Sequence, residues 1–165
     1  MQSDPRLFSK QHRFVIAGLL AMALPAAAES ATDVYTWSAE LVALDQAAKT
    51  VTVQSRLVSN ADVDFADFDA GDRLTLTWSG INTAAGVRRI VDGPAPADDR
   101  LTLPIEFVSA EHDNQYVRFT VAVPSEDLAK LASLAPGSWI TATSPRRAAR
   151  YEEAVVQVRP YNDVA

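Results

Sequence analysis

The chain of 165 residues carries a faint copy of itself, and this internal repeat constrains the fold more than any single residue does. Residues 35–79 align without a gap on residues 101–145 at an offset of 66, and nine of the 45 aligned positions are identical. A repeat of this length predicts that one supersecondary unit occurs twice. The shared positions include a turn glycine and several strand residues: Thr36/Thr102, Glu40/Glu106, Val42/Val108, Val51/Val117, Ser59/Ser125, Gly71/Gly137, Thr75/Thr141 and Thr77/Thr143.

Residues 1–28 have the layout of a secretory signal peptide. A basic start precedes an apolar run at 14–24, and Ala26 and Ala28 are the small residues expected before a cut at Glu29. The apolar run has 11 residues, whereas a helix that spans a bilayer needs about 20. The chain has no cysteine that could carry a lipid at the cut. We therefore expect an exported product, periplasmic or secreted, with no membrane span after signal cleavage.

Removal of residues 1–28 sharpens the composition of the chain. It takes away three of 15 basic and one of 21 acidic residues, which leaves 12 against 20 and a formal net charge of −8. Nucleic-acid binding relies on a basic surface that contacts phosphates, so no nucleic-acid partner is expected. Both methionines, Met1 and Met22, are also removed, and the remaining chain contains no sulfur. Disulfides and soft-metal sites are thereby excluded.

Alternating apolar and polar residues predict a mostly β chain. The clearest alternation is at 116–123, where Val117, Phe119 and Val121 share one face. In each copy the pattern indicates a hairpin, a short helix or turn, a glycine turn, a third strand and a last strand. The strands are expected at 34–44, 50–57, 73–79, 87–91, 105–110, 116–123, 138–143 and 154–158.

The insert after each hairpin changes to the period of a helix. In the second copy Leu128, Leu131 and Leu134 have helical spacing, and Ser125 is placed to cap the helix start. In the first copy Phe65 and Phe68 lie among aspartates, without the glutamate that closes a calcium loop. We expect a solvated acidic face opposite buried phenylalanines, with weak divalent-cation binding as the alternative, at Asp62, Asp64, Asp67, Asp69 and Asp72.

The stretches AELVALD at 39–45, VTV at 51–53 and AGDRLTL at 70–76 occur in an order that is similar to a known family. Each copy resembles the small OB-like barrels of the periplasm, notably the copper-chaperone barrels associated with metal efflux. That family holds copper with methionine, histidine and an aromatic lid, whereas residues 29–165 have no methionine and one histidine, His112. The resemblance therefore implies the architecture without the copper site, and no cofactor is expected.

These patterns predict an all-β protein of two tandem OB-like β-barrel repeats with short helical inserts. The repeats would span residues 29–92 and 101–165, joined by a linker at 93–100 that contains proline and glycine. One strand of a five-stranded barrel is hard to identify in either copy. The alternative is one eight-stranded barrel or sandwich built from two halves.

Residues that could carry catalysis are scarce. An imidazole lies beside carboxylates at Glu111, His112 and Asp113, in an expected hairpin turn. Acid–base catalysis needs such groups in a cleft, so we expect a solvated turn, with weak metal binding at the same three residues as the alternative. No Gly-x-Ser-x-Gly, phosphate-loop or His-Glu-x-x-His motif occurs. The protein is therefore not expected to be an enzyme.

Aromatic and arginine residues form the other candidate site. Trp37 and Trp139 are candidates for a surface on which a sugar or peptide stacks, whereas Trp78 shares a strand face with leucines and is expected in the core. Three arginines follow Trp139 and would suit an anionic group or an acidic partner if they gather in space; a solvated loop is the alternative. They are Arg146, Arg147 and Arg150.

Together these features predict an exported, non-catalytic binding or protein-interaction module of the bacterial envelope. Its partner would be an envelope protein or a small ligand, and exposed edge strands could recruit a protein by strand addition. A periplasmic protein that binds a small ligand, a sugar or a metal ion is the alternative.

Overall fold

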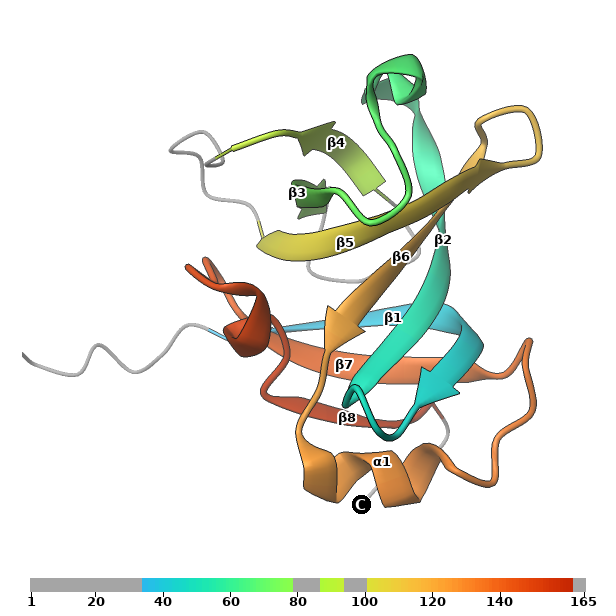
Figure 1. Ribbon diagram of the computed structural model, residues 1–165, viewed down its shortest axis with the longest axis vertical. Coiled ribbons are helices and arrows are strands. Elements are labelled where there is room, and N and C mark those ends of the chain that lie inside the picture. Colours follow the sequence, from blue (N-terminus) through green and yellow to red (C-terminus); the bar gives the residue numbers. More distant parts are fainter. Residues whose placement is uncertain (1–33, 79–86, 94–100, 162–165) are drawn as a thin grey trace, which may run out of the picture.

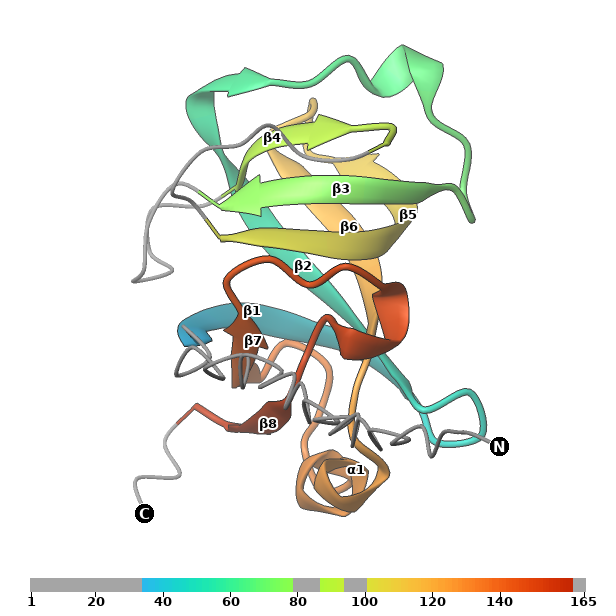
Figure 2. The same ribbon diagram turned by 90° about the vertical axis from the view of Figure 1, so that its left-hand side faces the viewer.

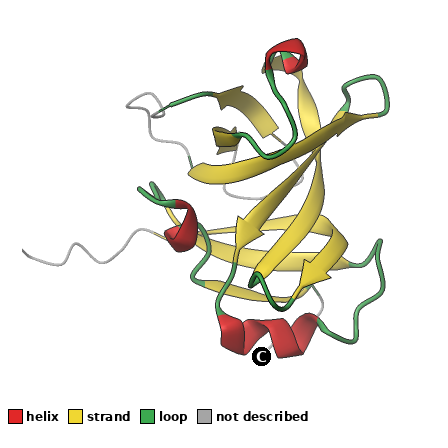
Figure 3. Cartoon of the chain, viewed as in Figure 1, coloured by secondary structure: helices red, strands yellow, loops and turns green. Residues whose placement is uncertain are grey.

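The computed structural model describes residues 34–78, 87–93 and 101–161. The predicted signal peptide at 1–28 and residues 94–100 of the predicted linker lie outside these ranges. Strands dominate what is described (Figure 3), so the all-β class is confirmed. Within the described ranges, no helix is long and apolar enough to cross a bilayer.

Residues 34–78, 87–93 and 101–161 form eight strands, one α-helix and two short 3-10 helices. The first copy contains β1 (Val34–Asp45), β2 (Thr50–Asp62), η1 (Phe65–Asp67), β3 (Arg73–Trp78) and β4 (Val87–Val91). The second copy contains β5 (Thr102–Glu111), β6 (Tyr116–Ala122), α1 (Ser125–Leu131), β7 (Trp139–Pro145), η3 (Tyr151–Glu153) and β8 (Gln157–Pro160).

Pairs of strands from the two copies alternate in one sheet, in the order β4-β3-β5-β6-β2-β1-β7-β8. The third strand of each copy pairs with the hairpin of the other, since β3 pairs with β5 and β7 pairs with β1. In Figure 1, β3, β4 and β5 lie above and β1, β7 and β8 lie below, and β2 and β6 run between the two groups. Two tandem barrels are therefore not confirmed, because the hydrogen bonding crosses from copy to copy instead of closing within each one.

Five of the strands together form a closed ring. β2, β6, β5, β3 and β4 pair in succession, and β4 returns to β2 through the parallel pairs Leu57 with Val87 and Asp62 with Arg89. Figure 2 shows this ring in the upper part of the molecule. The ring thus takes three strands, β2, β3 and β4, from the first copy and two strands, β5 and β6, from the second copy.

The two cross-copy ladders have the same register. Thr36 pairs with Thr143 on β1 and β7, and shifting both by 66 gives Thr102 and Thr77, which pair on β5 and β3. Strand pairing therefore follows the offset of the sequence alignment. Further equivalences are the irregularities at Leu41/Ala43 and Phe107/Ser109, and the backbone hydrogen bonds from Gly71 to Phe107 (2.8 Å) and from Gly137 to Leu41 (2.8 Å).

The hydrophobic core lies between the two groups of strands. Trp37, Trp78 and Phe119 are fully buried, and their ring centroids lie 5.2 to 6.4 Å apart. Phe119 pairs with Val53 at the centre of the β2–β6 ladder, and the 66-residue offset relates these two residues to each other. Apolar burial at this junction holds the two copies together.

The helix α1 covers the outer edge of β8, the last strand of the sheet. Its Asp127 is 3% exposed and accepts a hydrogen bond from the backbone N–H of Val158 at 2.9 Å. The other carboxylate oxygen lies 2.6 Å from Nζ of Lys130. The predicted cap at Ser125 is wrong, because the chain enters the helix at Pro124 with no side-chain cap. The acidic residue of the first turn is instead used to hold β8.

The last strand also differs from its prediction. It was expected at 154–158 but begins at Gln157. Ala154 and Val155 are buried, at 0% and 3% exposure, directly after η3. Their apolar side chains fill the core beneath this turn. The sequence pattern alone cannot distinguish such buried residues from the buried residues of a strand.

Candidate functional site

The face of the sheet opposite the core carries two rows of side chains, each crossing five strands. Residues that are opposite one another in a ladder point to the same face, so each row can be followed from strand to strand. The Trp139 row consists of Trp139, Glu40, Gln54, Arg118 and Ser109. The Arg73 row consists of Arg73, Glu106, Thr120, Thr52 and Ala43.

The 66-residue offset relates the two rows position by position. Trp139 occupies the place of Arg73, and Glu40 occupies the place of Glu106. The same backbone position therefore presents an indole in one row and a guanidinium in the other. The two rows lie on a common scaffold but have different chemistry.

Hydrogen bonds hold the polar centre of the Trp139 row. Arg118 donates from Nε to Oε1 of Gln54 at 2.9 Å, and its Nη1 lies 3.3 Å from Oε1 of Glu111. Ser109 donates to the same Glu111 oxygen at 2.6 Å. Gln54 is 9% exposed and lies opposite Arg118 in the β2–β6 ladder, so its amide oxygen orients the guanidinium. A guanidinium fixed in this way presents its remaining N–H groups in a defined plane.

The end of this row is an exposed aromatic pair. Trp139 is 52% exposed and Tyr161 is 56% exposed. Their ring centroids lie 6.4 Å apart in an edge-on arrangement, and the Tyr161 N–H donates to the Trp139 carbonyl at 3.0 Å. The next residue of the row, Glu40, is half-buried. The sequence prediction that Trp139 lies at the surface agrees with this placement.

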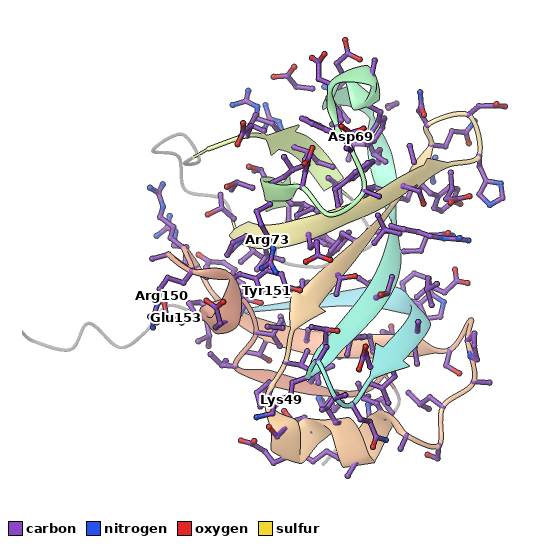
Figure 4. All side chains as sticks on the ribbon, viewed as in Figure 1. Lys49, Asp69, Arg73, Arg150, Tyr151 and Glu153 are labelled. Atoms are coloured by element: carbon purple, nitrogen blue, oxygen red, sulfur yellow. The ribbon has the colours of Figure 1, made fainter. Side chains whose placement is uncertain are left out.

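η3 lies at the Arg73 end of the Arg73 row, with Tyr151 against Arg73 (Figure 4). The guanidinium carbon of Arg73 lies 3.5 Å from the ring centroid of Tyr151, and Nη2 lies 2.9 Å from Oε2 of Glu106. Thr52 and Thr120 share a hydrogen bond of 2.9 Å beside them. A groove of about 780 Å³ runs over this row and continues along the β1–β2 turn.

The hydroxyl of Tyr151 is buried and has no hydrogen-bond partner among the described residues. Burial raises the pKa of Tyr151 to about 12, and the nearby Arg73 charge acts in the opposite direction. Desolvation dominates because the ionised phenolate would lose its water. Tyr151 therefore remains a neutral phenol on the wall of the groove.

The structure does not bring the sequence-predicted ligand-binding residues together. Trp37 is fully buried and donates from Nε1 to Oγ of Ser144 at 2.8 Å. Its prediction as a surface residue is wrong, because β1 buries the face that contains Trp37, Ala39 and Leu41.

The arginines lie far from the aromatic pair. Trp139 is the first residue of β7, whereas Arg146, Arg147 and Arg150 follow its last residue, and a seven-residue strand is about 20 Å long. Arg150 instead pairs with Glu153 (Figure 4), and the hydrogen bond that it donates to Glu153 is the main cause of its raised pKa. The Arg146 carbonyl accepts from the Thr102 N–H at 3.1 Å.

The predicted metal alternative at Glu111, His112 and Asp113 is not supported by the geometry. The carboxylate of Glu111 contacts Ser109 and Arg118, and the exposed His112 packs edge-on against Tyr116, with ring centroids 5.4 Å apart. His112 and Asp113 have positive φ angles of 52° and 53°, which belong to a tight turn. Among the described residues, no three His, Asp or Glu side chains form a group that could hold a metal ion.

The aspartates of the first copy are used in local structure. Asp64 accepts from the Ala66 N–H at 3.1 Å at the start of η1, and Asp72 accepts from the Asp69 N–H at 2.8 Å. The neighbouring rings of Phe65 and Phe68 pack on Phe107 of the second copy, and each ring centroid lies 5.9 Å from that of Phe107. These carboxylates serve as turn and helix caps.

Three interactions were not found from the sequence. They are the Arg73–Tyr151 stack, the Arg118 network and the Asp127–Val158 hydrogen bond. The 66-residue offset does align Trp139 with Arg73 and Glu40 with Glu106. That alignment is the sequence signal from which two equivalent surface rows could have been predicted.

No protein-family model, curated protein or solved structure matches this chain.

Proposed function

We propose that the protein is an exported, non-catalytic binding module of the bacterial envelope, and that it binds through the Trp139 row. The observation that carries this proposal is the exposed Trp139 at the end of a row of fixed polar side chains. Aromatic side chains supply large contact areas at binding surfaces. The duplicated pattern is then a scaffold, and binding belongs to one of its two equivalent rows.

The absence of catalysis in this proposal rests on the chemistry of the described residues. His112 is the sole histidine of residues 29–165 and lies exposed in a turn. A general acid–base residue works in a cleft with an adjusted pKa. The export in this proposal rests on the predicted signal peptide, and the mature protein should begin at Glu29, which intact mass measurement of the periplasmic fraction tests.

Site-specific photocrosslinking tests the binding surface. A benzophenone amino acid placed at position 139 of the full-length, exported chain should give discrete adducts in living cells. The matched control is the same amino acid at Val156, which is 48% exposed but lies outside the row. Equal labelling from both positions, or none from position 139, would contradict the proposed surface.

A small molecule in the groove over the Arg73 row is a second candidate. The unpartnered, buried hydroxyl of Tyr151 favours it, because buried polar groups are normally paired. A ligand that accepts a hydrogen bond there should raise the melting temperature of the native protein but not of a Tyr151→Phe variant. Equal stabilisation of both proteins would rule this site out.

A further inference from the structure

Strand addition by a peptide is obstructed at both ends of the sheet. At β8 the Val158 N–H already donates to Asp127 of α1, and Pro160 has no N–H to donate. At the other end, β4 pairs with β3 on one side and with β2 on the other. An extended peptide gains its affinity from backbone hydrogen bonds at such edges. A ligand of the Trp139 row therefore has to be recognised by side chains on the face of the sheet.

The row presents an apolar aromatic surface next to groups that bond hydroxyls. Trp139 and Tyr161 supply the aromatic surface. Glu40 lies opposite Trp139 in the ladder, and Arg118 lies two strands further along, oriented by Gln54. Neighbouring strands are about 4.8 Å apart, so these groups are spaced along a line across the sheet. This is the complement of a saccharide, which has an apolar C–H face and a periphery of hydroxyl groups.

The charges of the row favour a neutral saccharide over an acidic one. The guanidinium of Arg118 is already paired with Glu111 at 3.3 Å, and Glu40 adds a second carboxylate. The chain after the predicted signal peptide has a formal net charge of −8. A polyanionic glycan would meet repulsion both at the row and over the whole surface.

We propose that the Trp139 row binds a neutral oligosaccharide, with a sugar ring packed on Trp139 and hydroxyl groups bonded to Glu40 and Arg118. This inference rests on the proposed function, since it names the ligand class of the same surface. Several sugar rings in succession would follow the row across β7, β1, β2 and β6.

Saccharide titrations with the full mature chain test the proposal. Trp37 and Trp78 are fully buried, so a change in fluorescence at the surface reports on Trp139. The probes are the neutral hexasaccharides of N-acetylglucosamine, β-1,4-linked glucose and α-1,4-linked glucose, with a hexagalacturonate as the anionic comparison. At least one neutral probe should change the emission and show saturation-transfer NMR contacts.

Three variants separate the row from the rest of the surface. Trp139→Ala should weaken binding at least about tenfold, a loss of about 1.4 kcal/mol, and Glu40→Gln should weaken it by a smaller factor. The control Val156→Ala, also an exposed apolar residue, should bind like the wild-type chain. Circular dichroism and melting curves check that all three variants remain folded.

The outcomes distinguish the saccharide from the binding surface itself. No Trp139-dependent response to any neutral probe, or tighter binding of the hexagalacturonate, overturns the saccharide inference. If crosslinks from position 139 then lead to a protein, the proposed binding surface is retained and a protein is its ligand. If crosslinking and titration both fail, the proposed function fails as well.

Discussion

The two halves of the chain cover the outer edges of their last strands, β4 and β8, in different ways. In the first half β2 has 13 residues, and its extension pairs with β4. In the second half β6 has seven residues and ends at Ala122, and α1 lies against β8 instead. One half therefore closes its sheet with a strand, whereas the other closes it with a helix.

A single aligned position explains much of this difference. Val58 in β2 is matched by Pro124 at the 66-residue offset. Proline cannot donate to a ladder but is tolerated at the start of a helix, and α1 begins directly after Pro124. The comparison shows that one scaffold accepts two closures, because a sheet edge can be covered by a strand or by a helix.

The sharpest test of the comparison is to remove one carboxylate from each closure. Asp127→Ala should lower the free energy of unfolding by about 2–3 kcal/mol, because the buried Val158 N–H loses its acceptor. Asp62→Ala should lower it by less than about 1 kcal/mol, since the ion pair of Asp62 with Arg89 is exposed to solvent. Urea denaturation of both variants measures the difference. Equal losses would show that the two closures do not differ in strength.

The two central tryptophans of the first half provide the next largest contrast. Trp37 donates to the fully buried Ser144, whereas Nε1 of Trp78 is buried with no partner among the described residues. Trp37→Phe leaves the Ser144 hydroxyl without its donor, while Trp78→Phe removes an unpaired N–H. The first variant should therefore be less stable than the second by about 1 kcal/mol, as measured by chemical denaturation. The reverse order would contradict this assignment of hydrogen bonds.

The turn glycines should behave alike in the two halves. Gly71 and Gly137 have φ angles of +98° and +91°, and a Cβ added at either would meet no atom closer than 3.8 Å. Alanine at either position should cost about 1–2 kcal/mol through backbone strain alone. The two melting temperatures should fall by similar amounts. A much larger loss at one glycine would mean that its turn has a further role.

Ionisation of Tyr151 should have no effect on stability at neutral pH and a measurable effect in alkali. Its folded pKa is about 12, raised by burial from 10.0. Between these pH values the folded state holds more protons than the unfolded state, so stability falls as the pH rises from 10 to about 12. Ultraviolet titration of the tyrosines should include an ionisation step at about pH 12, which Tyr151→Phe removes. A Tyr151→Phe variant that keeps this step would contradict the assignment.

Much of the fold was accessible from sequence because its signals are local. Alternation predicted seven of the eight strands close to their observed positions, including β4 at Val87–Val91. The helical spacing of Leu128 and Leu131 predicted α1, in which both are buried. The surface position of Trp139 followed from its neighbours Thr141 and Thr143 on the same strand face. The burial of Trp37 was missed because β1 is flanked by β2 and β7, and only that pairing assigns its two faces.

The all-β class and the turn positions follow from the amino-acid sequence alone, because they depend on side-chain alternation and backbone conformation within a few residues. The pairing of β3 with β5 and of β7 with β1 became known from the three-dimensional fold. Two copies with the same pattern can close within themselves or with each other, since the residues that face a neighbouring strand are the same in both cases. The pairing between copies placed Trp139 beside Glu40 and Arg73 beside Glu106, and it thereby set the two rows on the surface.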